Sequence, residues 1–272
     1  MEPGSVLAGL WVLFSGTHVT LATRPIRDAL VRRCGELGFN LVFSLVASAS
    51  FALLVHYYAL HRLDGPPGFA LGRSEPVRLL LTAAIVVGIV LATAPLLSYH
   101  GSAYALFRRS TPPARGIERI TRHPFFVGVS LFASAHALLA TRLVGAVFAA
   151  GLAVFPMIGV WHQDRKLVAM RGTGHADYLK TTSTVPFVAI LTGGRQRFVW
   201  SELPLGSLAA GLVIAFALRA LHDGIFSRGG AFVIAAIVGG AAVETSLSWR
   251  RASRREGSAA REDSPHKGAK VM

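Results

Sequence analysis

Histidine is the residue of this chain best suited to chemistry, because an imidazole can ligate a metal or move a proton near neutral pH. Of the ten histidines, His18, His56 and His136 fall inside long apolar stretches, and His123 stands directly before one. A polar ring is costly to place among apolar residues of a membrane span, so each is a candidate functional residue. Small residues at helical spacing beside His18 and His136 would leave room for a planar ligand such as a porphyrin, or let helices pack closely.

The chain has a single cysteine, Cys34. One thiol excludes an intrachain disulfide and a multi-cysteine zinc or iron–sulfur site, and a covalent c-type haem would need two thiols. The sequence also shows no phosphate-binding glycine motif and no paired carboxylates suited to acid–base catalysis. The chemistry open to it therefore needs no thiolate cluster and no nucleophile–base pair.

The elements that must position these histidines are membrane spans. Hydrophobic residues make up 52% of the 272 residues and charged residues only 15%, which is too apolar for an ordinary soluble domain. A bilayer span needs roughly 20 mostly apolar residues, and the sequence offers seven such stretches: about 4–22, 39–59, 76–98, 124–141, 144–162, 203–221 and 229–248. We expect an all-α, polytopic transmembrane helix bundle in which the short link Thr141-Arg142-Leu143 makes the fourth and fifth spans an antiparallel hairpin.

The basic residues predict the orientation. The chain carries 28 Lys and Arg against 14 Asp and Glu. Between these spans, 22 of the basic residues fall in segments 22–38, 99–123 and 163–202 and in the tail, and four fall in the alternate loops. Cytoplasmic loops of membrane proteins are enriched in Lys and Arg, so we expect the N-terminus outside and the C-terminus in the cytoplasm. A multi-pass protein of a bacterial inner membrane accounts for the net charge without nucleic-acid binding.

Depth separates the candidate histidines. His136 and His18 differ by about 10 Å in expected depth, which helix tilt and two reaching imidazoles can close. His123 lies about 20 Å from His136 along the same helix, so these two cannot share a metal, and we expect His123 to be structural or at headgroup level. Arg122 and His123 form either a basic helix entry or an anion site. We also expect the helix end that carries Asp164 and Arg165 to pair with Arg119 or Arg122.

Several separated motifs, in one order over residues 10–198, resemble the NnrU family of membrane proteins and, within it, the zeta-carotene isomerases. They are Thr17-His18 with Arg24, Gly35-Glu36, His61-Arg62-Leu63-Asp64-Gly65, Gly116 through Pro124, Ala135-His136, Trp161 with Asp164-Arg165, Tyr178, and Thr182 through Phe187. Any one of these motifs alone would be a weak signal.

The resemblance implies a non-covalent haem b with His18 and His136 as axial ligands, and His61 as a further histidine needed for activity. It implies cis–trans isomerisation of an apolar polyene or isoprenoid substrate in the lipid bilayer. The isomerases carry a cysteine three residues before the second ligand, where this chain has Ala133. Residues 1–200 would form the NnrU-like domain, 201–248 two additional helices, and 249–272 a disordered basic tail able to contact anionic lipid.

Two alternatives stay open. Arg-His-Pro at a helix entry, followed by a hairpin and Val-Pro-Phe, is also similar to membrane methyltransferases of the isoprenylcysteine type, which bind S-adenosylmethionine. Their pattern has Tyr and a Glu-Glu pair where this chain has Phe126 and Asp164-Arg165. Other NnrU members are linked to nitrogen-oxide metabolism, so a non-catalytic membrane role is the third reading.

Overall fold

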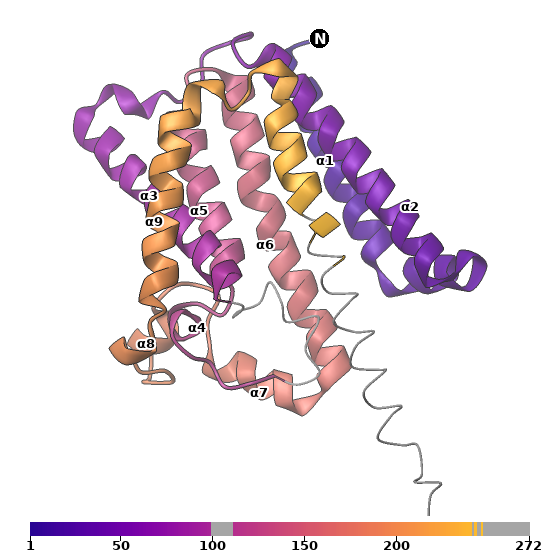
Figure 1. The fold of residues 1–272 in the computed structure, drawn as a ribbon, viewed down its shortest axis with the longest axis vertical. Coiled ribbons are helices and arrows are strands. Elements are labelled where there is room, and N and C mark those ends of the chain that lie inside the picture. Colours follow the sequence, from indigo (N-terminus) through magenta and orange to yellow (C-terminus); the bar gives the residue numbers. More distant parts are fainter. Residues whose placement is uncertain (99–110, 241, 244–245, 247–272) are drawn as a thin grey trace, which may run out of the picture.

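The computed structural model describes residues 1–98, 111–240, 242, 243 and 246, and these residues form helices without a β-strand. The expected all-helical class is confirmed. Figure 1 shows long helices standing side by side and the short α-helices gathered at one end of the bundle. The long helices are α1 (Pro3–Ala22), α2 (Arg24–His61), α3 (Glu75–Leu97), α5 (Pro124–Leu139), α6 (Leu143–Arg171) and α9 (Leu205–Leu221). The shorter elements are α4 (Ile117–Ile120), α7 (Thr173–Thr181), α8 (Val188–Leu191), η1 (Leu71–Arg73), η3 (Trp200–Glu202), η4 (His222–Gly224) and η5 (Arg228–Gly230).

Within the described part of the chain, five helical segments are long and apolar enough to cross a membrane: α1, α2, α3, α6 and Leu205–Gly224. Two further apolar helices, Pro124–Leu139 and Arg228–Gly240, coincide with the remaining predicted spans but are shorter. At 1.5 Å per residue, the 16 residues of α5 extend about 24 Å, somewhat less than the roughly 30 Å hydrocarbon layer. The chain is a membrane protein by these helices, while the count of seven and the orientation stay predictions. The predicted disordered tail lies outside the described residues.

The predicted loop at 22–38 is wrong, because α2 begins at Arg24 and runs through it. Pro25 in the first turn suits a helix start, where its missing N–H leaves no bond unmade. The helix is interrupted at Gly35, whose φ of 74° and ψ of 170° are readily adopted only by glycine. Arg27 pairs with Glu36 across this bend at 2.7 Å. The early arginines are therefore carried on a bent helical extension of the second span.

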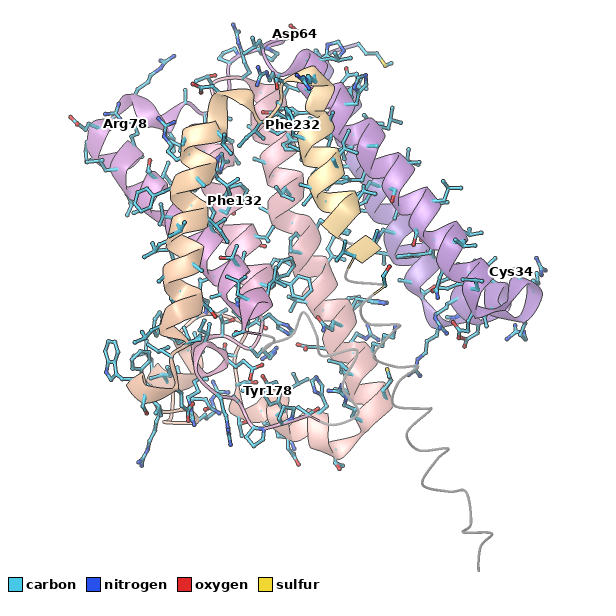
Figure 2. The ribbon with its side chains drawn as sticks, viewed as in Figure 1. Cys34, Asp64, Arg78, Phe132, Tyr178 and Phe232 are labelled. Atoms are coloured by element: carbon cyan, nitrogen blue, oxygen red, sulfur yellow. The ribbon has the colours of Figure 1, made fainter. Side chains whose placement is uncertain are left out.

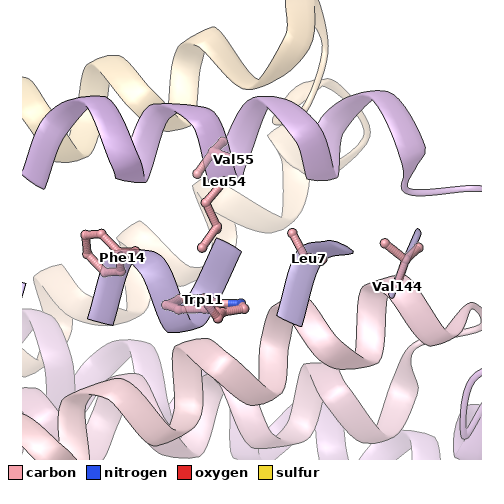
Figure 3. Packing of buried hydrophobic residues seen from close by; sticks show 6 residues of the cluster. All are labelled: Leu7, Trp11, Phe14, Leu54, Val55 and Val144. Atoms are coloured by element: carbon pink, nitrogen blue, oxygen red, sulfur yellow. The ribbon is translucent and has the colours of Figure 1, made fainter. Parts of the chain in front are cut away.

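Helix α6 occupies the middle of the bundle, and α1 and α5 both pack on it. The buried core between α1, α2 and α6 consists of Leu7, Trp11, Phe14, Leu54, Val55 and Val144 (Figure 3). Trp11 lies so close to Gly151 that a Cβ there would overlap its ring. Gly88 of α3 and Gly128 of α5 likewise approach each other's backbones, the small-residue contact typical of membrane helices.

The predicted hairpin of the fourth and fifth spans is confirmed. Helix α5 ends at Leu139, α6 begins at Leu143, and the two pack together. The Ser130 hydroxyl donates to the carbonyl of Ala153 at 2.8 Å, which ties the two antiparallel helices near their middle. This bond fixes the relative height of residues on α5 and α6.

Candidate functional site

His18 lies in an aromatic enclosure formed by α1, α2 and α6. Its ring centroid is 5.6 Å from that of Phe14, 4.9 Å from that of Phe43 and 5.3 Å from that of Phe155. The Nδ1 atom is buried and has no hydrogen-bond partner among the described residues. Buried polar atoms are normally satisfied, so an imidazole nitrogen left open here is a feature that a bound group would explain.

His136 lies on α5, one turn before its end. Its Nδ1 is 2.9 Å from the carbonyl oxygen of Phe132, so Nδ1 carries the proton and the lone pair is on Nε2. Histidines that ligate metals commonly donate their second nitrogen to a carbonyl in this way. The ring of His222, in η4, lies 6.4 Å from that of His136 with an angle of 18° between the planes. No pattern in the sequence indicates His222 at this place, because it lies 86 residues after His136.

His18 and His136 are on opposite faces of α6. Gly151 faces Trp11 of α1, whereas Ala153 bonds Ser130 of α5, and two residues correspond to about 200° around a helix. The Ser130–Ala153 bond gives a common reference height for α5 and α6. Along the helix axes, His136 lies about 9 Å from it toward one end of the bundle. Phe155, whose ring lies beside that of His18, is about 3 Å from it toward the opposite end. Ligation of one iron by both histidines stays a prediction, and it requires the two side chains to come together around α6.

His61 ends α2 and binds a neighbouring carboxylate. Its Nδ1 is 2.8 Å from Asp64, and its ring lies 4.4 Å from that of Tyr57. The side chain is 37% exposed, so His61 lies at an end of the bundle rather than in its interior. Ala133, at the position of the family cysteine, is fully buried in α5. His56 contacts the carbonyl of Gly229 at 3.1 Å, which gives it a structural partner.

The arginine-rich end of the bundle holds a buried polar network centred on Asp164. One carboxylate oxygen lies 2.9 Å from Nε2 of His123 and the other 3.0 Å from Arg122. His175 of α7 approaches the first oxygen at 3.8 Å and contacts Thr111 through Nδ1 at 3.1 Å. The expected pairing of Asp164 with Arg122 is confirmed. The role of His175 was missed, because its sequence context is that of an ordinary loop.

The second expected arginine, Arg119, pairs elsewhere. It binds Glu202 at 2.7 Å, and this contact holds the pKa of the Glu202 carboxyl at about 2, aided by the backbone N–H of Gly116. Burial lowers the pKa of His175, and the nearby Asp164 partly opposes that effect. The Asp164 contacts thus connect the start of α5 with α6 and α7, and the Arg119–Glu202 pair connects α4 with η3.

Two distant motifs are brought together by backbone bonds at this end. The N–H of Arg122 donates to Ser183 at 2.8 Å, and the N–H of Phe187 donates to Ile120 at 2.9 Å. The Thr121 hydroxyl donates to the carbonyl of Thr184 at 2.7 Å. Beside this junction is an open cleft of about 480 Å³. Its lining consists of Arg122, Val160, Trp161, Asp164, Arg165, Val168, Ala169, Leu179 and Thr184.

The family whose description is "NnrU protein" matches residues 6–228. The chain belongs to the NnrU family. Over 192 residues this NnrU protein is 28% identical to the chloroplastic 15-cis-zeta-carotene isomerase of Arabidopsis thaliana and 26% identical to that of Zea mays. Each match covers 71% of this chain and 52% of the relative, so the chain spans about half the length of these curated relatives. No solved structure matches.

The donor set of this NnrU protein limits the cofactors it can hold. Among the described residues, no three of His, Cys, Asp and Glu converge as a metal-binding group. A bare structural zinc needs four ligands, whereas a porphyrin already supplies four to its iron and needs only one or two from the protein. His18 and His136, each with an open nitrogen, suit the second case.

Proposed function

We propose that this protein binds haem b non-covalently and catalyses cis–trans isomerisation of a conjugated, carotenoid-like polyene in a bacterial inner membrane. Family membership and the names of the two relatives support the reaction class. The observation that carries the haem proposal is His136, whose Nδ1 is fixed by Phe132 and whose Nε2 is free to bind a metal.

The residues present fit a haem by their donor chemistry. His136 would supply one axial nitrogen, and the unpartnered imidazole of His18 is the proposed second ligand. Haem iron, when bound, can lend electron density to a polyene and lower the order of its double bond. Because Ala133 is no ligand, a thiolate cannot take part in any ligand exchange at this site.

The protein's own contribution would be an apolar surface for the substrate. Phe14, Phe43 and Phe155 surround His18 with aromatic faces against which a conjugated chain can lie. An isomerisation needs neither proton transfer nor water, which suits an enclosure without carboxylates among these neighbours. His61, bound to Asp64 at the end of α2, is proposed to act from the bundle end, as a residue required for activity.

The methyltransferase alternative is not favoured by the geometry. Both oxygens of Asp164 are engaged by Arg122 and His123, so this carboxylate is not free to receive the amino or sulfonium group of S-adenosylmethionine.

The absorption spectrum of the detergent-purified protein, expressed with haem supply, tests the proposal. We expect a Soret band and sharp reduced α and β bands, and conversion of a cis polyene such as the zeta-carotene named for the relatives. A colourless protein that takes up no added haemin, or one that binds haem but leaves the polyene unchanged, would contradict the corresponding half of the proposal.

A further inference from the structure

The cleft beside Asp164 lies at the depth of lipid headgroups. Trp161 and Arg165 come 18 and 22 residues after Leu143, where α6 begins. At 1.5 Å per residue these positions lie about 27 and 33 Å along the helix, whereas the hydrocarbon layer is about 30 Å thick. Trp161 is 59% exposed, as expected for a ring in the interfacial layer.

A positive charge without a carboxylate partner stands at this cleft. The Arg165 guanidinium lies 4.5 Å from the centroid of the Trp161 ring and makes no ion pair among the described residues. Arg122, which also lines the cleft, is neutralised by Asp164 at 3.0 Å. The cleft therefore presents one net positive charge, and a planar guanidinium suits a phosphate because it can donate two parallel hydrogen bonds.

The walls of the same cleft are apolar. Val160 and Val168 of α6 and Leu179 of α7 line it. Free inorganic phosphate makes no use of such walls, whereas an alkyl chain gains about 25 cal/mol for each Å² of apolar surface removed from water. Val160 precedes Arg165 on α6 and lies toward the hydrocarbon layer. A cation at headgroup depth with an apolar side chain on its membrane side matches the two ends of an amphiphile.

The carboxylate that lines the cleft is already paired and does not attract a cationic headgroup. Asp164 already serves Arg122 and His123, so the cleft lacks a free carboxylate among its lining residues. We propose that the cleft between α6 and α7 binds an amphiphile with an anionic phosphate headgroup, with Arg165 as the residue that selects the phosphate. This site is separate from His18 and His136 and does not depend on haem binding.

Binding of short-chain lipids to the purified full chain, measured by native mass spectrometry or titration calorimetry, tests the site. Dihexanoyl phosphatidic acid supplies both ends of the amphiphile, inorganic phosphate only the charge, and dihexanoyl phosphatidylcholine a headgroup without net charge. We expect phosphatidic acid to bind at least several-fold more tightly than either of the others. If inorganic phosphate binds as tightly as phosphatidic acid, the proposal that the ligand is an amphiphile is overturned. If phosphatidylcholine binds as tightly as phosphatidic acid, the proposed selection for negative charge is overturned.

The variant Arg165→Gln should weaken phosphatidic acid binding about tenfold, because a charge-assisted hydrogen bond is lost. Arg197→Gln is the matched control: it removes the same charge from a residue that does not line the cleft, and its affinity should stay within about twofold of the unaltered protein. Because Arg165 is exposed, its replacement should leave the thermal midpoint unchanged. Equal losses in both variants would show a general charge effect and overturn the assignment.

Discussion

The imidazole rings of His136 and His222 lie nearly parallel, with centroids 6.4 Å apart. Two imidazoles on opposite sides of one metal, with metal–nitrogen bonds of about 2 Å, would have a similar ring separation of about 6 Å. His222 would therefore compete with His18 for the second ligand position if His136 held an iron. Replacing each histidine in turn can show which of His18 and His222 is the second ligand.

If the proposed haem is bound, His136→Ala should lose it or turn high-spin, because the proposed strong-field ligand is removed. His18→Ala should do the same, as its open nitrogen is the proposed second ligand, while His123→Ala should keep the low-spin spectrum because His123 is bound to Asp164. The measurement is the absorption spectrum of each reduced protein. A low-spin His18 variant together with a high-spin His222→Ala variant would assign the second position to His222 instead.

The helix bundle could be predicted from the sequence because each span is a local apolar run. The same reasoning failed at residues 22–38, where charges hid the helix that precedes Gly35. It also failed for His222, since no local pattern reports which loop folds back over the end of α5. Phe226 against Tyr58 and Gly229 against His56 show that this loop crosses to α2, which is a property of long-range packing.

Removing the charge of Asp164 should destabilise the arginine-rich end. Asp164→Asn leaves the partly buried Arg122 and the buried His123 without their carboxylate, at a cost of about 3 kcal/mol, because removing one partner of a largely buried pair leaves the other without compensation. Asp177→Asn, which disrupts an exposed pair with Lys180, should cost less than about 1 kcal/mol. Denaturation monitored in detergent gives both values. A loss of stability in Asp164→Asn as small as that in Asp177→Asn would show that the network does not stabilise the fold.

The buried His175 predicts loss of stability in mild acid. Its pKa is lowered on folding, so the unfolded chain binds more protons and stability increases with pH. The contribution is fully present above the unfolded value of about 6.5 and is lost as the pH falls below it. Thermal midpoints between pH 5 and 8 should fall on the acidic side and fall less in His175→Gln. An unchanged slope in that variant would place the titrating group elsewhere.

The pairing of Arg122 with Asp164 could be foreseen, because both stood at helix ends on the predicted cytoplasmic side. The partner of Arg119 could not, since Glu202 reaches it from the segment before α9. Charge complementarity in a sequence shows that a pair is possible, whereas backbone bonds such as Phe187 to Ile120 decide which segments meet.

Close packing of α1 on α6 predicts a sharp contrast between two glycines. Gly151→Ala would force a methyl group into the Trp11 ring and should destabilise by about 1–3 kcal/mol. Gly9→Ala, in α1, meets no atom within 4 Å and should be neutral or slightly stabilising, because alanine is the better helix former. Thermal unfolding in detergent compares them. A neutral Gly151→Ala would contradict the close packing of α1 on α6.

The orientation can be tested with Cys34, the only cysteine, whose side chain is exposed. Figure 2 shows Cys34 and Asp64 at opposite ends of α2. The 27 residues from Cys34 to His61 extend about 40 Å, more than the hydrocarbon thickness, so the two ends of α2 should lie on different sides of a membrane. With the N-terminus outside, a membrane-impermeant maleimide should leave Cys34 unlabelled in intact bacterial cells and label it after lysis.

In a Cys34→Ser background, Leu63→Cys places a thiol beside Asp64 at an exposed position and should be labelled in intact cells. The reverse pattern, with Cys34 accessible from outside, would invert the orientation predicted from the arginines.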